Sequence, residues 1–228
     1  MDSDWLIKTL ISANVLYFAL SLVLSTRTGD SGSFLSPGQT SLMLLGATGT
    51  YPIAHFGRFW TVISANYLHG GIIHLIFNLM ALKQIAPWAS SEFGSSRMFT
   101  IYTLGGVIGY LISFFAGVPF TIGASAAVCS LIGALLYYGK SRGGAYGSSV
   151  YREVSGWIIS LFVFGLIFPG INNWGHGGGI IGGVVIGALI GYNERRRENS
   201  FDHTLALLCA LATVGVLGWA TVRAFIYS

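Results

Sequence analysis

Apolar residues in this chain gather into seven long runs that polar segments separate. These runs predict membrane helices over residues 5–25, 74–89, 98–116, 124–138, 154–168, 174–192 and 204–226. Some of them are shorter than the ~20 residues that span a hydrocarbon core of ~30 Å. The connection over residues 26–71 is long, and its mixed stretch 42–60 is too short for a clean span. We predict a structured loop there that lies partly in the membrane interface.

Composition supports a membrane protein. Of the 228 residues, 53% are hydrophobic and 9% are charged, and the mean hydropathy is +0.68, whereas soluble domains are about 25% charged. We therefore expect an all-α, polytopic helical bundle with a single domain over residues 1–228, and no nucleic-acid partner. Cys129 and Cys209 lie in apolar runs, which favours buried thiols over a disulfide. The acidic start Met1-Asp2 argues against a cleaved signal peptide.

Basic residues predict the direction of the helices. With a cytoplasmic N-terminus, most of them fall in inner connections, namely Arg97, Lys140, Arg142, Arg152, Arg195, Arg196 and Arg197. This bias is what the positive-inside rule requires. Lys83 falls within a span, and we expect it to snorkel toward the interface rather than to contact a substrate.

Two polar residues, Ser125 and His176, stand in apolar runs near the outer side. Ser125 lies 15 residues before Lys140, which is roughly 22 Å of helix and places it roughly 8 Å short of the outer interface. The segment 119–123 before Ser125 is then irregular backbone at membrane depth. Such backbone must be buried in protein or line a water-filled cavity, and hydrolysis needs such a cavity.

Small residues offer a way for Ser125 and His176 to meet. The run that contains His176 has a glycine at every fourth position, namely Gly175, Gly179, Gly183, Gly187 and Gly191. The run that contains Ser125 has a small stripe of its own, formed by Ser125, Cys129 and Gly133. Such stripes let helices pack closely, and packing alone would also explain them. A membrane serine often only bonds a carbonyl of its own helix, whereas an intramembrane histidine is a functional candidate.

His74 and Asn78 supply a third element. They are four residues apart at the outer end of the second run, so they share one helix face. Both can donate hydrogen bonds, which suits a developing oxyanion. The alternative is that both hold down the long loop. His69 is five residues before His74, off that face, and is expected to be a structural loop histidine.

Other intramembrane chemistries lack their residues. A zinc protease needs His-Glu-x-x-His, and the sequence has no such motif, so we expect no metal. An aspartyl mechanism needs two carboxylates inside the membrane. The aspartates are predicted to lie outside the spans, at Asp2, Asp4, Asp30 and Asp202. Only serine chemistry has its parts present.

These residues resemble the rhomboid family of intramembrane serine proteases. The similarity covers about residues 42–192, with a further span at each end. It rests on three motifs in order: His69-x4-His74-x3-Asn78, Gly123-Ala124-Ser125, and His176-x2-Gly179-x3-Gly183. Each motif alone is modest, whereas three in the right order on the right helices are strongly specific.

The resemblance implies a six-helix core over about 5–193 and an additional C-terminal helix over about 204–226. It implies that Ser125 is the nucleophile and His176 the general base, and that His74, Asn78 and the backbone N–H of Ser125 hold the oxyanion. Gly123, Gly179 and Gly183 would be supporting backbone positions.

Substrates would be transmembrane proteins cleaved in or next to a membrane helix, without a cofactor. Short loops and the absence of a large soluble domain favour localisation in a bacterial cytoplasmic membrane. The alternatives are a rhomboid-like pseudoprotease that binds membrane clients and, less in keeping with the absence of an internal repeat, a small transporter.

Two departures from the family pattern concern the catalytic pair. Ala126 stands where the motif most often has Gly, and its methyl group is expected to narrow the space beside Ser125. Cys129 stands where many relatives have an aromatic that packs on the catalytic histidine. We therefore expect His176 to be held less firmly.

Overall fold

The computed structural model describes residues 3–30, 32–33, 35–168 and 170–228. Met1 and Asp2, on which the expectation about a signal peptide rested, lie outside the described residues. The long helices of this part are α1 (Ser3–Thr28), α5 (Ile72–Phe93), α6 (Ser95–Phe115), α7 (Ser125–Arg142), α8 (Gly144–Ile167), α9 (Asn173–Ile190) and α10 (Ser200–Ile226). Short helices fill the first connection: α2 (Gln39–Leu45), α3 (Thr50–Phe56), α4 (Thr61–Ser64) and the 3₁₀ turn η1 (Ala65–Tyr67). Each predicted span corresponds to one long helix, and the all-α bundle is confirmed.

Within the described residues, α7 differs from the other long helices. Six helices are long and apolar enough to cross a membrane, and these are α1, α5, α6, α8, α9 and α10. The 18 residues of α7 include Lys140 and Arg142 in the last turn. Composition therefore supports six of the seven predicted spans. The helix is instead surrounded by its neighbours, and residues 126–135 are all buried.

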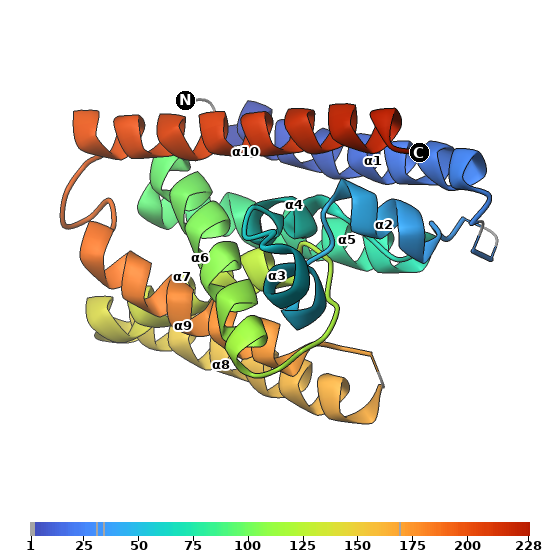
Figure 1. Cartoon of the computed structure of the whole chain (residues 1–228). Coiled ribbons are helices and arrows are strands. Elements are labelled where there is room, and N and C mark those ends of the chain that lie inside the picture. The colour runs from blue at the N-terminus through green and yellow to red at the C-terminus, as the bar shows by residue number, and fades with distance from the viewer. Residues whose placement is uncertain (1–2, 31, 34, 169) are drawn as a thin grey trace.

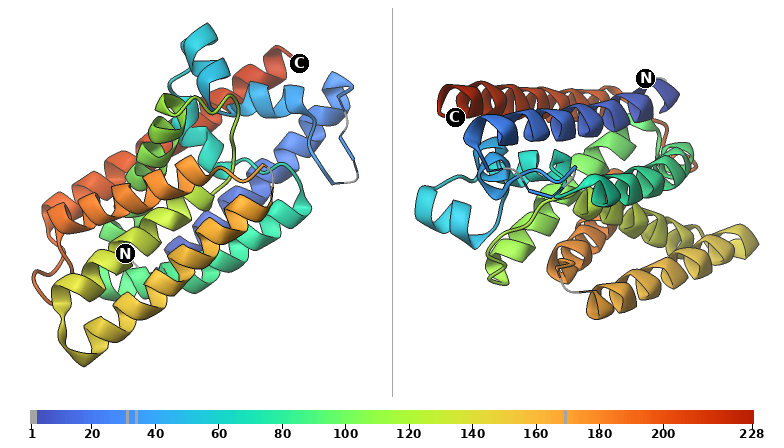
Figure 2. Two further views of the ribbon diagram at one scale, coloured as in Figure 1. Left: turned by 90° about the horizontal axis from the view of Figure 1, so that it is seen from below. Right: turned by 90° about the vertical axis from the view of Figure 1, so that its right-hand side faces the viewer.

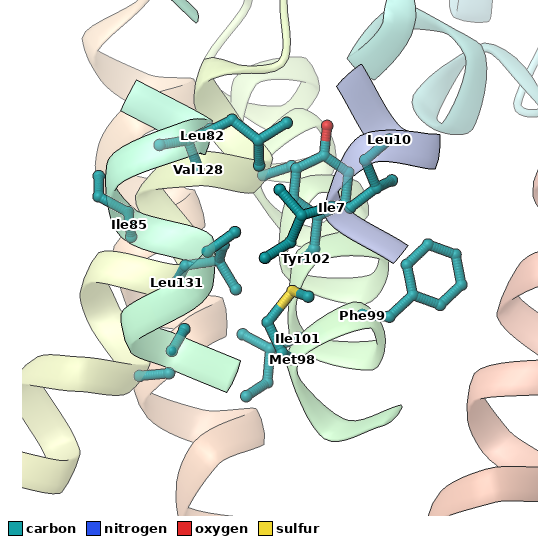
Figure 3. Close-up of a cluster of buried hydrophobic side chains, with 14 of the residues drawn as sticks. Ile7, Leu10, Leu82, Ile85, Met98, Phe99, Ile101, Tyr102, Val128 and Leu131 are labelled. Carbon is teal, nitrogen blue, oxygen red and sulfur yellow. The ribbon is translucent and has the colours of Figure 1, made fainter. Parts of the chain in front are cut away.

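The long helices form layers around α7 (Figures 1 and 2). Helices α1 and α10 lie along one face of the bundle and α8 along the opposite face. α7 packs most extensively on α9, and α9 also packs on α6. Figure 3 shows part of the core, to which four helices contribute the labelled side chains Ile7 and Leu10, Leu82 and Ile85, Met98, Phe99, Ile101 and Tyr102, and Val128 and Leu131.

The glycines of α9 bring its backbone against α7. A Cβ atom on Gly183 would lie 2.6 Å from the carbonyl carbon of Ser130, and one on Gly179 would lie 3.1 Å from that of Ala126. Real carbon contacts are ~3.5–4.0 Å, so only glycine fits at this distance. The predicted packing of the two stripes is confirmed. Two glycines of the predicted stripe are exceptions. A Cβ on Gly175 would meet Asn172 and Ser113 of α6, and Gly191 ends the helix with φ 72° and has no neighbour near its Cβ position.

A second row of glycines packs α9 on α6. A Cβ on Gly178 would lie 3.0 Å from the Cα of Gly109, and one on Gly182 would lie 3.2 Å from the Cα of Gly105. α9 is therefore in close backbone contact with two helices at once, which fixes its position in the bundle. The four-residue stripe predicted from the sequence is one of these two faces.

The first connection is a structured loop, as predicted, and it is joined to the irregular segment before α7. Thr48 and Thr121 exchange backbone hydrogen bonds of 3.1 and 2.8 Å, and Thr50 N donates to Val118 O at 2.8 Å. The irregular backbone over 118–123 thereby has protein partners, as membrane depth requires. The loop also contacts α10, where the rings of Trp60 and Trp219 meet edge-to-face at 4.8 Å.

Two charged residues lie elsewhere than predicted. α10 begins at Ser200 because Asn199 and Asp202 form a reciprocal capping box, so Asp202 lies in the first turn of that helix and not outside it. Arg97 lies in the first turn of α6 rather than in an inner connection. It is fully buried, and its guanidinium donates to Asp202 at 3.0 Å. Arg196 pairs with the same carboxylate at 2.8 Å.

Candidate active site

Ser125 is the first residue of α7, and its position is set by the segment before it. Gly123 has φ 126°, a conformation that favours glycine. The amide of Gly123 donates to Ala65 O at 2.9 Å, and its carbonyl accepts from the Tyr110 hydroxyl. The preceding Ala124 provides no side-chain cap for the helix. The first N–H groups of α7 therefore have no intrahelical partner and a positive dipole end, beside the Ser125 hydroxyl.

His176 lies in the first turn of α9, which Asn172 caps. The Asn172 side chain accepts from the amide of Gly175 at 2.9 Å, and its backbone carbonyl accepts from the amide of His176 at 3.0 Å. The Asn172 carboxamide also donates to Ser113 Oγ at 2.8 Å and to Thr121 Oγ1 at 2.9 Å. One side chain thus joins the start of α9 to the end of α6 and to the segment before Ser125.

Ser125 and His176 come together across the α7–α9 contact. The distance from Ser125 Oγ to His176 Nε2 is 2.9 Å, within hydrogen-bonding range. For the hydroxyl to donate, the imidazole proton must be on Nδ1. Nδ1 is buried and has no hydrogen-bond partner among the described residues. Among the described residues the imidazole is therefore hydrogen-bonded through Nε2 only.

His74 lies on the other side of Ser125, against Gly123. A Cβ atom on Gly123 would be 2.8 Å from His74 Nε2, so the absence of a side chain brings this nitrogen close to the nucleophile's segment. His74 Nδ1 accepts from the amide of Gly70 at 3.4 Å, which leaves Nε2 to carry the proton. Asn78 donates one amide hydrogen to His74 O at 2.9 Å. His74 thus hydrogen-bonds the loop through Nδ1 and faces the site through Nε2. The two interpretations of His74, as an anchor of the loop and as an oxyanion donor, are therefore compatible.

His69 has a different position from the four candidate site residues. It is fully buried, and its ring meets the ring of His74 edge-to-face at 5.1 Å between centroids. It does not line the cavity that contains the other residues. This position agrees with a structural loop histidine that braces His74.

A cavity of about 880 Å³ lies between α5, α7, α8 and the start of α9. Ser125, His176, His74 and Asn78 all line it, so the residues predicted separately from three motifs share one space. Its remaining lining is mainly apolar and aromatic. Lys83, which was expected to snorkel, is exposed and does not line the cavity.

The two departures from the family pattern have different outcomes. Cys129 is buried and lines the cavity one turn after Ser125. Ala126, in contrast, does not line it, so the expectation that its methyl narrows the space beside Ser125 is wrong. The methyl points to α6 and packs in a separate cluster with Ile53, Val62, Ala65 and Tyr110.

Sequence reasoning did not single out Asn172 or Tyr110. Asn172 had a usable signal, because asparagine is a preferred N-cap residue and it directly precedes the glycine-rich helix. Tyr110 had no such signal, because an aromatic residue in an apolar run is typical of a hydrophobic core. Its contact with Gly123 O depends on how α6 packs against the irregular segment.

Comparison with known proteins gives consistent matches. The Rhomboid domain model matches residues 56–193. The chain is 32% identical over 203 residues to the rhomboid protease GluP of Bacillus subtilis (strain 168), covering 89% of this chain and 39% of that protein. It is 29% identical over 208 residues to RHOMBOID-like protein 4 of Arabidopsis thaliana, covering 82% and 52%. A third relative, Inactive RHOMBOID-like protein 8 of Arabidopsis thaliana, is 25% identical over 201 residues, covering 78% and 56%. The chain therefore spans between 39% and 56% of the length of these relatives.

Proposed function

This chain belongs to the rhomboid family, and from that membership we propose that it is a serine endopeptidase that cleaves peptide bonds in or next to transmembrane helices. In this proposal Ser125 is the nucleophile and His176 is the general base. The observation that carries it is the 2.9 Å contact between Ser125 Oγ and His176 Nε2. A serine hydroxyl requires such an adjacent base to become nucleophilic.

The proposed reaction follows from the positions of the donors. His176 Nε2 takes the proton of Ser125 as Oγ attacks the carbonyl carbon, and the carbonyl oxygen becomes an oxyanion. His74, Asn78 and the backbone N–H of Ser125 would donate to that oxygen. His176 then protonates the leaving amine as the peptide bond breaks, and water hydrolyses the acyl-enzyme by the reverse sequence. Each oxyanion donor of this kind contributes about 10²–10³-fold to the rate.

The walls of the cavity favour a substrate that enters from the membrane. α8 is the least embedded of the six candidate spans, with 11% of its apolar window buried against 61% for α6. It packs mainly on α7 and has few contacts with α9. The buried residues of α8 all lie in its first half, at Gly147, Val150 and Val154, so its second half, which lines the cavity, can move aside more easily than the other walls. The site would then open sideways to another helix in the bilayer.

The alternative within the family is a pseudoprotease that binds membrane clients without cleaving them. One relative is named inactive, so family membership alone does not decide between the two. The presence of both Ser125 and His176 in hydrogen-bonding contact favours the protease. The transporter alternative has no support from these matches.

The deciding experiment uses purified protein in liposomes with a transmembrane substrate whose helix is destabilised near one end. We expect cleavage by the wild type, none by Ser125→Ala or His176→Ala, and labelling of Ser125 by a fluorophosphonate. Cys129→Ala is the matched control, because Cys129 is the one thiol among the described cavity residues. Cleavage by Ser125→Ala would refute the catalytic pair. A wild type that binds substrate but neither cleaves it nor takes up the label would establish the pseudoprotease.

The chain is a multi-pass integral membrane protein. We further propose that its N-terminus is cytoplasmic and that it resides in a bacterial cytoplasmic membrane. The support is the gathering of basic residues at the end of the bundle away from Ser125, here called the basic end, which contains Lys140, Arg142 and 195–197.

A further inference from the structure

Two polar side chains line the cavity away from the catalytic pair. Gln84 projects from α5 and Ser160 from α8, and both are exposed. Their neighbours along the same walls are apolar, namely Ala81, Ile85 and Leu161. A carboxamide and a hydroxyl in such a lining need an explanation, because an apolar residue would serve a purely lipid-facing wall better.

The contact between α5 and α8 shows where these two residues lie relative to each other. The helices run in opposite directions, and the rings of Trp88 and Trp157 meet at 5.7 Å. Beyond that contact, the Tyr146 hydroxyl donates to Glu92 at 2.7 Å, so α5 and α8 are joined toward the basic end. Gln84 precedes Trp88 by four residues and Ser160 follows Trp157 by three. Each is about one turn from the aromatic contact, on its catalytic side. They face one level of the cavity, where the two walls begin to separate.

Gln84 lies near the middle of α5, which is one of the candidate membrane spans. It is twelve residues from the start of α5 and nine from its end, or roughly 18 Å and 14 Å along the helix axis. Its carboxamide has no hydrogen-bond partner among the described residues. Ser160 donates to Gly156 O at 2.9 Å, and its oxygen remains free to accept. Polar groups within membrane helices form hydrogen bonds across helices. The unpaired donor and acceptor groups of the Gln84 carboxamide therefore favour a hydrogen-bonding partner on an incoming helix.

The charge of the cavity limits the chemistry of that partner. Of the described residues that line it, none is Lys or Arg. An ionised carboxylate at the level of Gln84 would therefore be unpaired in a low-dielectric space, which is costly. A neutral amide or hydroxyl has no such cost and can exchange hydrogen bonds with both walls.

We propose that Gln84 and Ser160 form a polar subsite that hydrogen-bonds an Asn, Gln, Ser or Thr side chain in the transmembrane segment of the substrate. This inference rests on the proposed protease function. Gln84 is six residues beyond Asn78 and ten beyond His74 on α5. The subsite is thus roughly 9–15 Å from the oxyanion donors, toward the basic end. The protein would then select substrates by the polar residue in their transmembrane segment as well as by the instability of the substrate helix at the cleaved bond.

The test uses liposomes and a series of synthetic transmembrane peptides that carry Leu, Asn or Asp at one position, moved along the segment on the basic side of the cleaved bond. We expect kcat/KM for Asn to exceed that for Leu by about 3- to 10-fold at one position, the range of an interhelical hydrogen bond. Asp at that position gives no gain. Gln84→Met removes the preference, measured within each variant as the ratio of kcat/KM for the Asn peptide to that for the Leu peptide, and Ser160→Ala reduces it.

Lys83→Met is the matched control, because Lys83 is the polar neighbour on α5 that does not line the cavity. This variant keeps the preference. An equal preference in Gln84→Met, or no position at which Asn is favoured, overturns the subsite. Affinities of the same peptides for Ser125→Ala protein, measured by energy transfer in vesicles, give a second readout. If the wild type cleaves nothing, these affinities still test the subsite, while the proposed proteolysis fails separately.

Discussion

Replacing Gly183 by alanine tests whether the packing of α9 on α7 sets the geometry of the Ser125–His176 pair. The new Cβ would lie 2.6 Å from the Ser130 carbonyl carbon and closer still to its oxygen. Relief of that overlap requires α9 to move by about 1 Å. His176 is two turns away on the same helix, so its 2.9 Å contact with Ser125 would lengthen beyond hydrogen-bonding range.

The structure supplies matched controls on the same helix. A Cβ on Gly177 meets nothing within 4 Å, and one on Gly187 would be 3.4 Å from Ala134. All three alanines gain about 1 kcal/mol of helix propensity, so differences among them report packing. Overpacking costs about 1–3 kcal/mol. We expect Gly177→Ala to be stabilised or neutral, Gly187→Ala to be close to it, and Gly183→Ala to be about 2–4 kcal/mol less stable than Gly177→Ala.

The measurements are thermal unfolding in detergent and the rate of substrate cleavage. A displacement of 1 Å at a catalytic group costs on the order of 10²-fold in rate, so Gly183→Ala should lose that much and the two controls little. Fluorophosphonate labelling of Ser125 should fall in parallel. If Gly183→Ala unfolds and cleaves like Gly177→Ala, close backbone contact does not position His176 and the reasoning is refuted.

Two further predictions concern polar contacts. Asn172→Ala removes the N-cap of α9 and two side-chain hydrogen bonds, and should cost about 2–4 kcal/mol in thermal unfolding. Asn172→Asp keeps the capping oxygen and should fall between it and wild type, whereas equal loss in both variants would show that the cap contributes nothing. Arg97→Met leaves the buried carboxylate of Asp202 with one partner fewer and should destabilise by about 3–5 kcal/mol. Arg142→Met, which breaks a partly exposed pair with Glu194, should cost at most about 1 kcal/mol, and similar effects of the two would contradict the buried role of Arg97.

The sequence predicted the helices well because a helix that spans a membrane requires a long run of apolar residues. It also predicted that Ser125 and His176 meet, since both small-residue stripes begin at the same end of their helices. The ends of the helices were less predictable. α10 begins four residues before the apolar run, because Asn199 and Asp202 cap it with polar side chains that hydropathy excludes from a span.

Contacts between distant segments were beyond the reach of sequence patterns. Arg97 was assigned to an inner connection, and its contacts with Asp202 and with the carbonyls of residues 196–197 make it a buried residue. Ala126 looked like an obstruction beside Ser125, because the motif does not reveal which way its methyl points. The second row of glycines on α9 was not predicted, because glycines occupy two adjacent faces of this helix and the four-residue spacing was assigned to one face only.

The Arg97–Asp202 pair has a consequence for the order in which the protein is made. The two residues are 105 positions apart, so α6 leaves the ribosome and enters the membrane long before its acidic partner exists. Until α10 arrives, the Arg97 guanidinium has no carboxylate to neutralise it, and a lone arginine at the edge of the bilayer is unfavourable. The nascent bundle therefore stays unfinished at its basic end. Docking of the start of α10 against α6 is therefore the step that gives Arg97 its carboxylate partner and closes this end of the described bundle.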